Sequence, residues 1–218
     1  MTDEVIEKEN AAIAQAYKEL LKVSYRTLSA DDKKLIRSAF DVALDGHKNQ
    51  RRKSGEAYIF HPLAVAKIVA QEIGLDATSI AAALLHDVVE DNKDISIEDI
   101  ERLFGKTVAK IVDGLTKISS LSKEQDMHAS LQAENFRKML LTLNDDVRVI
   151  IIKIADRLHN MQTMDAMRPD KQVKIASETL YIYAPLAHRI GLYNIKTELE
   201  DLGLKYTEPE VYNDILFK

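Results

Sequence analysis

The sequence predicts an all-α protein. Its 218 residues contain only 7 glycines and 4 prolines, too few turn formers for a β-sandwich or barrel, whose strands end about every ten residues. Through most of the chain, apolar residues instead recur at intervals of three and four, as on one face of a helix. Because 46% of the residues are hydrophobic, such helices can bury a substantial core.

Composition and charge exclude several classes of protein. The absence of cysteine excludes disulfides, zinc-thiolate sites, iron–sulfur clusters and cysteine nucleophiles. Lys and Arg number 30 against 35 Asp and Glu, and this net charge of −5 argues against direct nucleic-acid binding by a basic surface. The acidic start of the chain is no signal peptide, and no apolar run reaches the roughly 18 residues that a membrane span needs. We therefore expect a cytoplasmic protein without membrane segments.

Helix-start residues and periodicity define the elements of the first half. Ser29 is a plausible N-cap with acids in the following turn, Pro62 suits a first helical turn, and Gly74 ends that helix. Asp76 opens a helix that we expect to run through the apolar stretch into His86 and Asp87. The expected helices are 3–23, 30–44, 62–72, 77–87, 97–105 and 107–118, the last with Gly114 as a weak point.

The second half reads as further helices around one polar segment. Residues 119–130 are the most loop-like part of the chain, and Pro169 and Pro185 break or bend the later pattern. The β-branched content of 147–154 also allows a buried strand, but we favour a helix because the helical period continues past residue 155. The expected helices are 131–143, 145–164 and 171–183, with the pattern continuing to 199.

Four polar residues follow directly on an apolar helical stretch. On a continuous helix, His86, Asp87, Glu90 and Asp91 fall within about 140° of one face. One imidazole and three carboxylates together indicate a site of chemistry. The alternative is a solvated helix end after a buried segment.

A second candidate is Asp156, which follows the apolar run and has Asn160 and Thr163 on the same helical face at i+4 and i+7. The alternative is a structural acid paired with Arg157 or Arg148. His61 gains significance only together with the other candidates. Two imidazoles and two carboxylates would suit a divalent ion such as Mn²⁺ or Fe²⁺ better than the all-oxygen sites of Ca²⁺ and Mg²⁺. These four residues are His61, His86, Asp87 and Asp156.

A local basic stretch interrupts the acidic chain. Lys48, Arg51, Arg52 and Lys53 could attract an anion, and the planar guanidinium of Arg52 could also stack on a base. The alternative is a solvated polar loop.

Four sequence blocks are more specific than the single residues: 52–62 (RKSGEAYIFHP), 86–91 (HDVVED), 156–161 (DRLHNM) and 183–189 (YAPLAHR). In this order they resemble the long RelA/SpoT-type (p)ppGpp synthetase/hydrolases, and the spacing of the histidines and aspartates resembles the HD-domain metal phosphohydrolases. The resemblance covers the chain from about residue 30 onward. Two departures are Ala57, where the family usually has proline, and Gln162, where a basic residue is common.

The resemblance implies an HD-type hydrolase domain over 1–170, and linking helices over 171–218 that lead to a synthetase domain outside this chain. It implies hydrolysis of the 3′-pyrophosphate of ppGpp or pppGpp, to GDP or GTP and pyrophosphate, with one bound Mn²⁺. By the same resemblance, His61, His86, Asp87 and Asp156 bind the metal, and Glu90 and Asp91 form the catalytic acidic pair. The implied substrate contacts are Arg52, Lys53, Ser54, Asn160 and Thr163.

Two other functional classes remain open at this point. One is a noncatalytic module that binds the alarmone without cleaving it, against which the intact acidic pair argues. The other is an HD phosphohydrolase for a different nucleotide, against which the 52–56 block argues. We expect a small-molecule substrate and the synthetase domain of the parent chain as the partners of this fragment.

Overall fold

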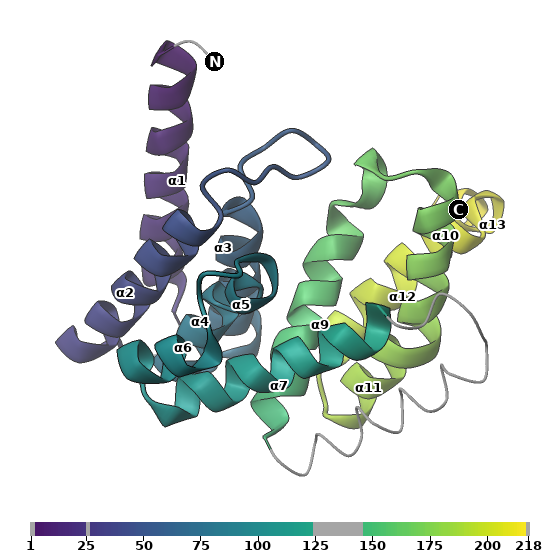
Figure 1. Ribbon diagram of the computed structural model, residues 1–218. Coiled ribbons are helices and arrows are strands. Elements are labelled where there is room, and N and C mark those ends of the chain that lie inside the picture. The colour runs from purple at the N-terminus through teal and green to yellow at the C-terminus, as the bar shows by residue number, and fades with distance from the viewer. Residues whose placement is uncertain (1–2, 25–26, 124–145, 217–218) are drawn as a thin grey trace. The chain divides into compact units, whose positions relative to one another are not determined.

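The computed structural model describes residues 3–24, 27–123 and 146–216 (Figure 1). Within these ranges the regular structure is helical, and the one β-type feature is an isolated bridge between Arg51 and Ala57, which confirms the all-α prediction. No helix among the described residues is long and apolar enough to cross a membrane. By its contacts the chain divides into two compact units, Met1–Ile152 and Lys153–Lys218.

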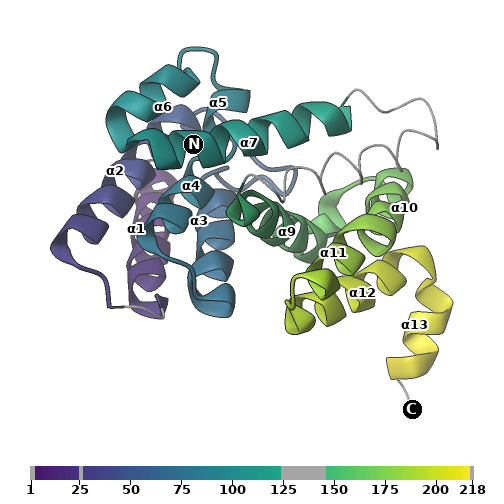
Figure 2. The same ribbon diagram turned by 90° about the horizontal axis from the view of Figure 1, so that it is seen from below.

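The first unit is organised around a short buried helix. Helix α4 (Ala77–Leu84) contacts α2, α3 and α7, and its residues from Ser79 to Leu84 are all buried (Figures 1 and 2). Its alanines allow this close approach because they carry little side-chain volume. The other helices of the unit are α1 (Asp3–Val23), α2 (Ala30–Gly46), α3 (Phe60–Lys67), which continues as a π-helical turn (Ile68–Ile73), α5 (Val88–Asp91), α6 (Ile97–Phe104), α7 (Lys106–Lys123) and the start of α9 (Val147–Gln162).

Helix boundaries in this unit follow the predicted caps. Ser29 accepts a hydrogen bond from the backbone N–H of Asp32 at 3.1 Å, and the Asp32 carboxylate accepts one from the N–H of Ser29 at 2.9 Å. These two bonds form a capping box that satisfies two backbone donors at the start of α2. Asp76 caps α4 through the N–H of Ser79 at 3.0 Å. Gly74 ends the preceding helix with φ at 76°, a left-handed conformation that favours glycine.

Helix α7 differs from its prediction at both of the marked places. It runs through Gly114 without a break. A Cβ at this position would lie 2.9 Å from a side-chain methyl of Val149, so the glycine allows α9 to approach closely. Helix α7 also continues to Lys123, so the predicted loop over 119–130 is wrong for its first five residues. The remainder of that loop and the predicted helix 131–143 lie outside the described residues.

The helix predicted to run into His86 and Asp87 is interrupted. It ends at Leu84, residues 85–87 form a turn, and α5 then begins at Val88. The imidazole Nδ1 of His86 lies 2.7 Å from the Ala83 carbonyl oxygen. The His86 side chain therefore donates a hydrogen bond to a carbonyl in the last turn of α4. The prediction of one continuous helical face carrying His86, Asp87, Glu90 and Asp91 is therefore wrong.

The second unit begins within α9, and the strand alternative for 147–154 is wrong because these residues are helical. Helix α12 (Tyr193–Thr207) contacts α10, α11 and α13. The remaining elements are a 3-10 turn (Met164–Ala166), α10 (Pro169–Glu178), a π-helical turn (Thr179–Tyr183), α11 (Ala184–Arg189) and α13 (Pro209–Leu216). The predicted pattern through 199 is thus divided at residues 190–192, and α13 was not predicted.

A partly buried arginine, Arg157, connects α9 to the helices that follow it. The Arg157 guanidinium donates to Glu178 at 2.7 Å and lies over the Tyr183 ring at 4.2 Å from its centroid. Burial by itself lowers the pKa of Arg157, but Tyr183 and Glu178 outweigh that effect and raise it. The guanidinium therefore stays charged inside the unit and fixes α9 against α10 and the π-helical turn.

Candidate metal centre

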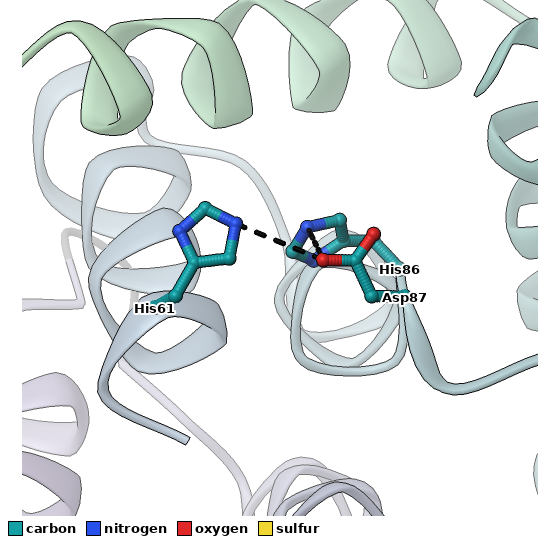
Figure 3. A group of neighbouring side chains, drawn as sticks. All are labelled: His61, His86 and Asp87. Carbon is teal, nitrogen blue, oxygen red and sulfur yellow. Dashed lines mark ion pairs between the residues drawn. The ribbon is translucent and has the colours of Figure 1, made fainter. Parts of the chain in front are cut away.

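Three of the predicted ligands converge in the first unit. His61 is the second residue of α3, while His86 and Asp87 belong to the turn after α4, and the three side chains face one another (Figure 3). Each offers one ligand atom, and these atoms lie within 4.8 Å of one another. The Oδ2 atom of Asp87 lies 2.9 Å from Nε2 of His86 and 3.8 Å from Nε2 of His61.

The donor set and its hydrogen bonds fit a divalent cation. A carbonyl oxygen can only accept, so the Nδ1 of His86 that contacts Ala83 carries the proton, and a neutral ring then presents the lone pair of Nε2 to Asp87. His61 is 1% exposed and His86 3% exposed. Two imidazole nitrogens and a carboxylate oxygen are ligands that borderline divalent metals accept. The cluster could therefore hold a metal ion.

Tyr58 is a site residue that the sequence analysis missed. Its hydroxyl donates a hydrogen bond to Oδ2 of Asp87 at 2.7 Å, and its ring lies edge-on to His61 with 5.7 Å between the ring centroids. The only signal in the sequence is its position three residues before His61, inside the 52–62 block. Nothing in the spacing links it to a carboxylate 29 residues away.

Glu90 and Asp91 lie on the single turn of α5, directly after Asp87. The N–H of Asp91 donates to the Asp87 carbonyl at 2.9 Å, so the acidic pair is connected to the cluster through the backbone. Glu90 is partly buried and Asp91 is exposed. Neither belongs to the group of potential ligands described above. Their catalytic role stays a prediction.

The predicted substrate residues of the first unit lie on a closed loop. The loop is held by backbone hydrogen bonds from Tyr58 to Gln50 at 3.1 Å and from Arg52 to Glu56 at 2.9 Å. Lys53 and Ser54 are exposed at its tip.

Two residues of the basic stretch 48–53 form ion pairs within the protein. Arg51 forms an ion pair with Glu9 of α1, and Lys48 forms one with Asp45 at 3.0 Å. These two charges are therefore paired with acidic side chains of the protein itself.

Asp156 belongs to the second unit, and its partners differ from those predicted. Its carboxylate contacts Lys153 Nζ at 2.8 Å and accepts a hydrogen bond from Asn160 at 2.7 Å. The structural alternative named Arg157 or Arg148, but these pair with Glu178 and Asp146 instead. The membership of Asp156 in the metal site stays a prediction.

The other two residues predicted on the Asp156 face are placed as follows. Asn160 shares that face, as its hydrogen bond to Asp156 shows. Thr163 lies just beyond the end of α9, and its hydroxyl donates to the His159 carbonyl at 2.8 Å. Their contacts with substrate stay predictions.

Comparison with known proteins places these residues in a family context. Residues 39–193 match the family model described as HD domain. An Escherichia coli (strain K12) protein named bifunctional (p)ppGpp synthase/hydrolase SpoT is 52% identical over 188 residues, which cover 86% of this chain and 26% of that protein. A Vibrio cholerae protein named guanosine-3′,5′-bis(diphosphate) 3′-pyrophosphohydrolase is 51% identical over 193 residues, which cover 88% of this chain and 27% of that protein. The chain thus spans about a quarter of the length of these curated relatives.

One solved structure is similar in both fold and sequence. It is described by the words "A metazoan ortholog of SpoT hydrolyzes ppGpp and plays a role in starvation responses". It is 29% identical, has a TM-score of 0.59, and the match covers 81% of this chain and 96% of that one.

Proposed function

The chain belongs to the HD-domain family, and from that premise we propose that it removes the 3′-pyrophosphate of ppGpp or pppGpp in a reaction that depends on Mn²⁺. The observation that carries the proposal is the convergence of His61, His86 and Asp87 on ligand atoms within 4.8 Å of one another. The names of the Escherichia coli and Vibrio cholerae relatives support the choice of substrate.

In this proposal Asp156 joins His61, His86 and Asp87 as the ligands of one ion. A divalent ion in such a site supplies an activated water and neutralises phosphate charge. The protein's own contribution is orientation. The hydrogen bond from His86 Nδ1 to Ala83 directs Nε2 toward Asp87, and the burial of both imidazoles keeps bulk water away from them.

Glu90 and Asp91 move the proton in the proposed reaction. One water is consumed, its oxygen forms a bond to the phosphorus nearest the ribose, and the bond from that phosphorus to the 3′ oxygen breaks. A carboxylate accepts the water proton and returns it to the leaving 3′ oxygen. The position of the pair one turn after Asp87 supports this role, because it places carboxylates beside the metal ligands without making them ligands.

The remaining contacts bind the nucleotide. Arg52 stacks on the guanine, while Lys53 and Ser54 bind phosphate from the exposed tip of the loop. Asn160 and Thr163 contact the ribose or the phosphates from the end of α9. In a longer parent chain, residues 171–218 link this region to a synthetase domain.

Pyrophosphate release from ppGpp tests the proposal. The protein is stripped of metal, resupplied with Mn²⁺, and measured against a panel of other nucleotides. Release that depends on Mn²⁺ and is selective for ppGpp supports the proposal. Binding of ppGpp without release would indicate a sensing module, and activity on another nucleotide would indicate a different HD phosphohydrolase.

A further inference from the structure

Tyr58 contacts the carboxylate at the centre of the cluster. Its hydroxyl lies 2.7 Å from Oδ2 of Asp87, and because an ionised carboxylate can only accept, the phenol is the donor. The same Oδ2 faces Nε2 of His86 at 2.9 Å and Nε2 of His61 at 3.8 Å. The oxygen that accepts the hydrogen bond from the phenol is thus the same oxygen that lies near the two imidazole nitrogens.

Contacts that do not involve Asp87 hold Tyr58 in place. Its ring packs against His61, with 5.7 Å between centroids, and against His47, with 4.7 Å between centroids. Its backbone N–H donates to the Gln50 carbonyl at 3.1 Å. His47 is 2% exposed, and its Nδ1 lies 2.5 Å from the side-chain oxygen of Gln50. These contacts fix the position of the phenol independently of its hydrogen bond to Asp87.

The orientation of an aspartate carboxylate depends on its hydrogen-bond donors. The torsion that turns an Asp carboxylate is broad, so the side chain alone does not select the orientation of its oxygens. A donor at a fixed position selects one orientation. Hydrogen-bond partners of metal ligands typically change metal affinity by about 10- to 100-fold when they are removed.

We propose that Tyr58 is a positioning residue that holds the Asp87 carboxylate in its metal-binding orientation. The inference rests on the proposed metal set of His61, His86, Asp87 and Asp156, and it assigns Tyr58 no contact with the substrate. Tyr58 also closes the loop that carries Arg52 through its backbone bond to Gln50, so one residue connects the metal ligand to the nucleotide-binding loop. The ring and the backbone hold the loop, while the hydroxyl orients Asp87.

The substitution Tyr58→Phe separates these two roles because it removes only the hydroxyl. The Mn²⁺ affinity of the stripped protein, measured by calorimetry, should fall by about tenfold or more. At saturating Mn²⁺, kcat and the KM for ppGpp should stay within about twofold of wild type, since the ring and backbone contacts remain.

Tyr206→Phe is the matched control. It removes a hydroxyl that donates to Asp165 Oδ1 over the same distance, 2.7 Å, in the second unit. It should leave Mn²⁺ affinity unchanged. Thermal unfolding of both variants shows whether either substitution disturbs the fold.

The outcomes distinguish this inference from the proposed function. Wild-type protein that binds no Mn²⁺ would overturn the metal centre and the role of Tyr58 together. Wild-type binding with unchanged affinity in Tyr58→Phe would overturn the positioning role alone. A loss of kcat in Tyr58→Phe at saturating Mn²⁺ would also overturn it, because it would place the hydroxyl at the reacting groups.

Discussion

Lys153 Nζ lies 2.8 Å from Oδ2 of Asp156, three residues further along α9. The Lys153 side chain is 13% exposed and that of Asp156 9% exposed, so the pair is largely removed from water. Asn160 donates to the other carboxylate oxygen at 2.7 Å. Lys153 and Asn160, both on α9, therefore fix the orientation of the two Asp156 carboxylate oxygens.

The substitution Asp156→Asn tests whether this carboxylate is a metal ligand. It keeps an oxygen for Asn160 but removes the charge, and a neutral amide is a weaker ligand for a divalent metal. Mn²⁺ content after stripping and reloading should fall from one ion per chain to a small fraction, and pyrophosphate release should be lost. Asp201→Asn, at an exposed position on α12, is the control. Full metal content in Asp156→Asn would remove this residue from the ligand set.

The acidic pair should affect turnover and not metal binding. In the double variant Glu90→Gln with Asp91→Asn, kcat should fall by about 10²- to 10⁴-fold, the usual contribution of proton transfer. Mn²⁺ affinity should stay at the wild-type value, because neither residue is proposed as a ligand. The exposed Asp94→Asn on the next loop serves as the control. A double variant that loses its metal would mean that the ligand assignment is wrong.

Arg157 should be a large contributor to the stability of the second unit. Arg157→Met removes the partly buried ion pair with Glu178, whose side chains are 13% and 25% exposed, and the contact with the Tyr183 ring. Breaking a fully buried pair costs about 3 kcal/mol because the remaining charge is left without its partner, so this partly exposed pair should cost about 2 kcal/mol. Urea unfolding measures the change, and Arg168→Met, whose side chain is 75% exposed, should change stability by less than about 1 kcal/mol. Equal effects of the two variants would contradict this account.

The contact between Asp146 and Arg148 at the start of α9 should make the free energy of unfolding depend on pH. The hydrogen bonds from Arg148, at 2.8 and 3.0 Å, lower the pKa of the Asp146 carboxyl below its ordinary value. A folded-state pKa below the unfolded one stabilises the protein above the unfolded pKa of about 4, and this contribution is lost as the pH falls through the folded value. Asp146→Asn should therefore lower the unfolding free energy by about 1 kcal/mol at pH 7.

The sign of this effect is checked by a series of thermal unfolding curves from pH 7 to pH 3. The difference between wild type and Asp146→Asn should shrink as the pH falls below about 4. Asp170→Asn removes a similar but exposed pair with Arg168 and should show little difference throughout. A difference that grows toward low pH would mean that Arg148 does not lower the pKa of Asp146.

Much of the fold follows from local signals in the sequence. The caps at Ser29 and Asp76 and the stop at Gly74 were predicted because each depends on a side chain or a backbone conformation within a few residues. The break before His86 was not predicted, because it depends on an imidazole that bonds to the Ala83 carbonyl, and periodicity does not report such a bond.

The site shows the same division. Residue types and the resemblance to known motifs predict one ligand set of four residues, and the structure brings three of them together, His61, His86 and Asp87. The fourth, Asp156, stays a prediction. Tyr58 was missed because its role depends on a contact with Asp87 across 29 residues of sequence. The structural alternative for Asp156 named Arg157 or Arg148, whereas its partner is Lys153, three residues earlier on the same helix. Helical spacing could have indicated this pair, because side chains at i and i+3 are neighbours on a helix.

The measurement that tests the central claim most directly is pyrophosphate release from ppGpp by the metal-stripped chain, before and after Mn²⁺ is restored. The account predicts no release from the stripped protein, release after Mn²⁺ is added, and loss again on chelation. Release that is unaffected by stripping and chelation, or no release from protein that binds both Mn²⁺ and ppGpp, would contradict it.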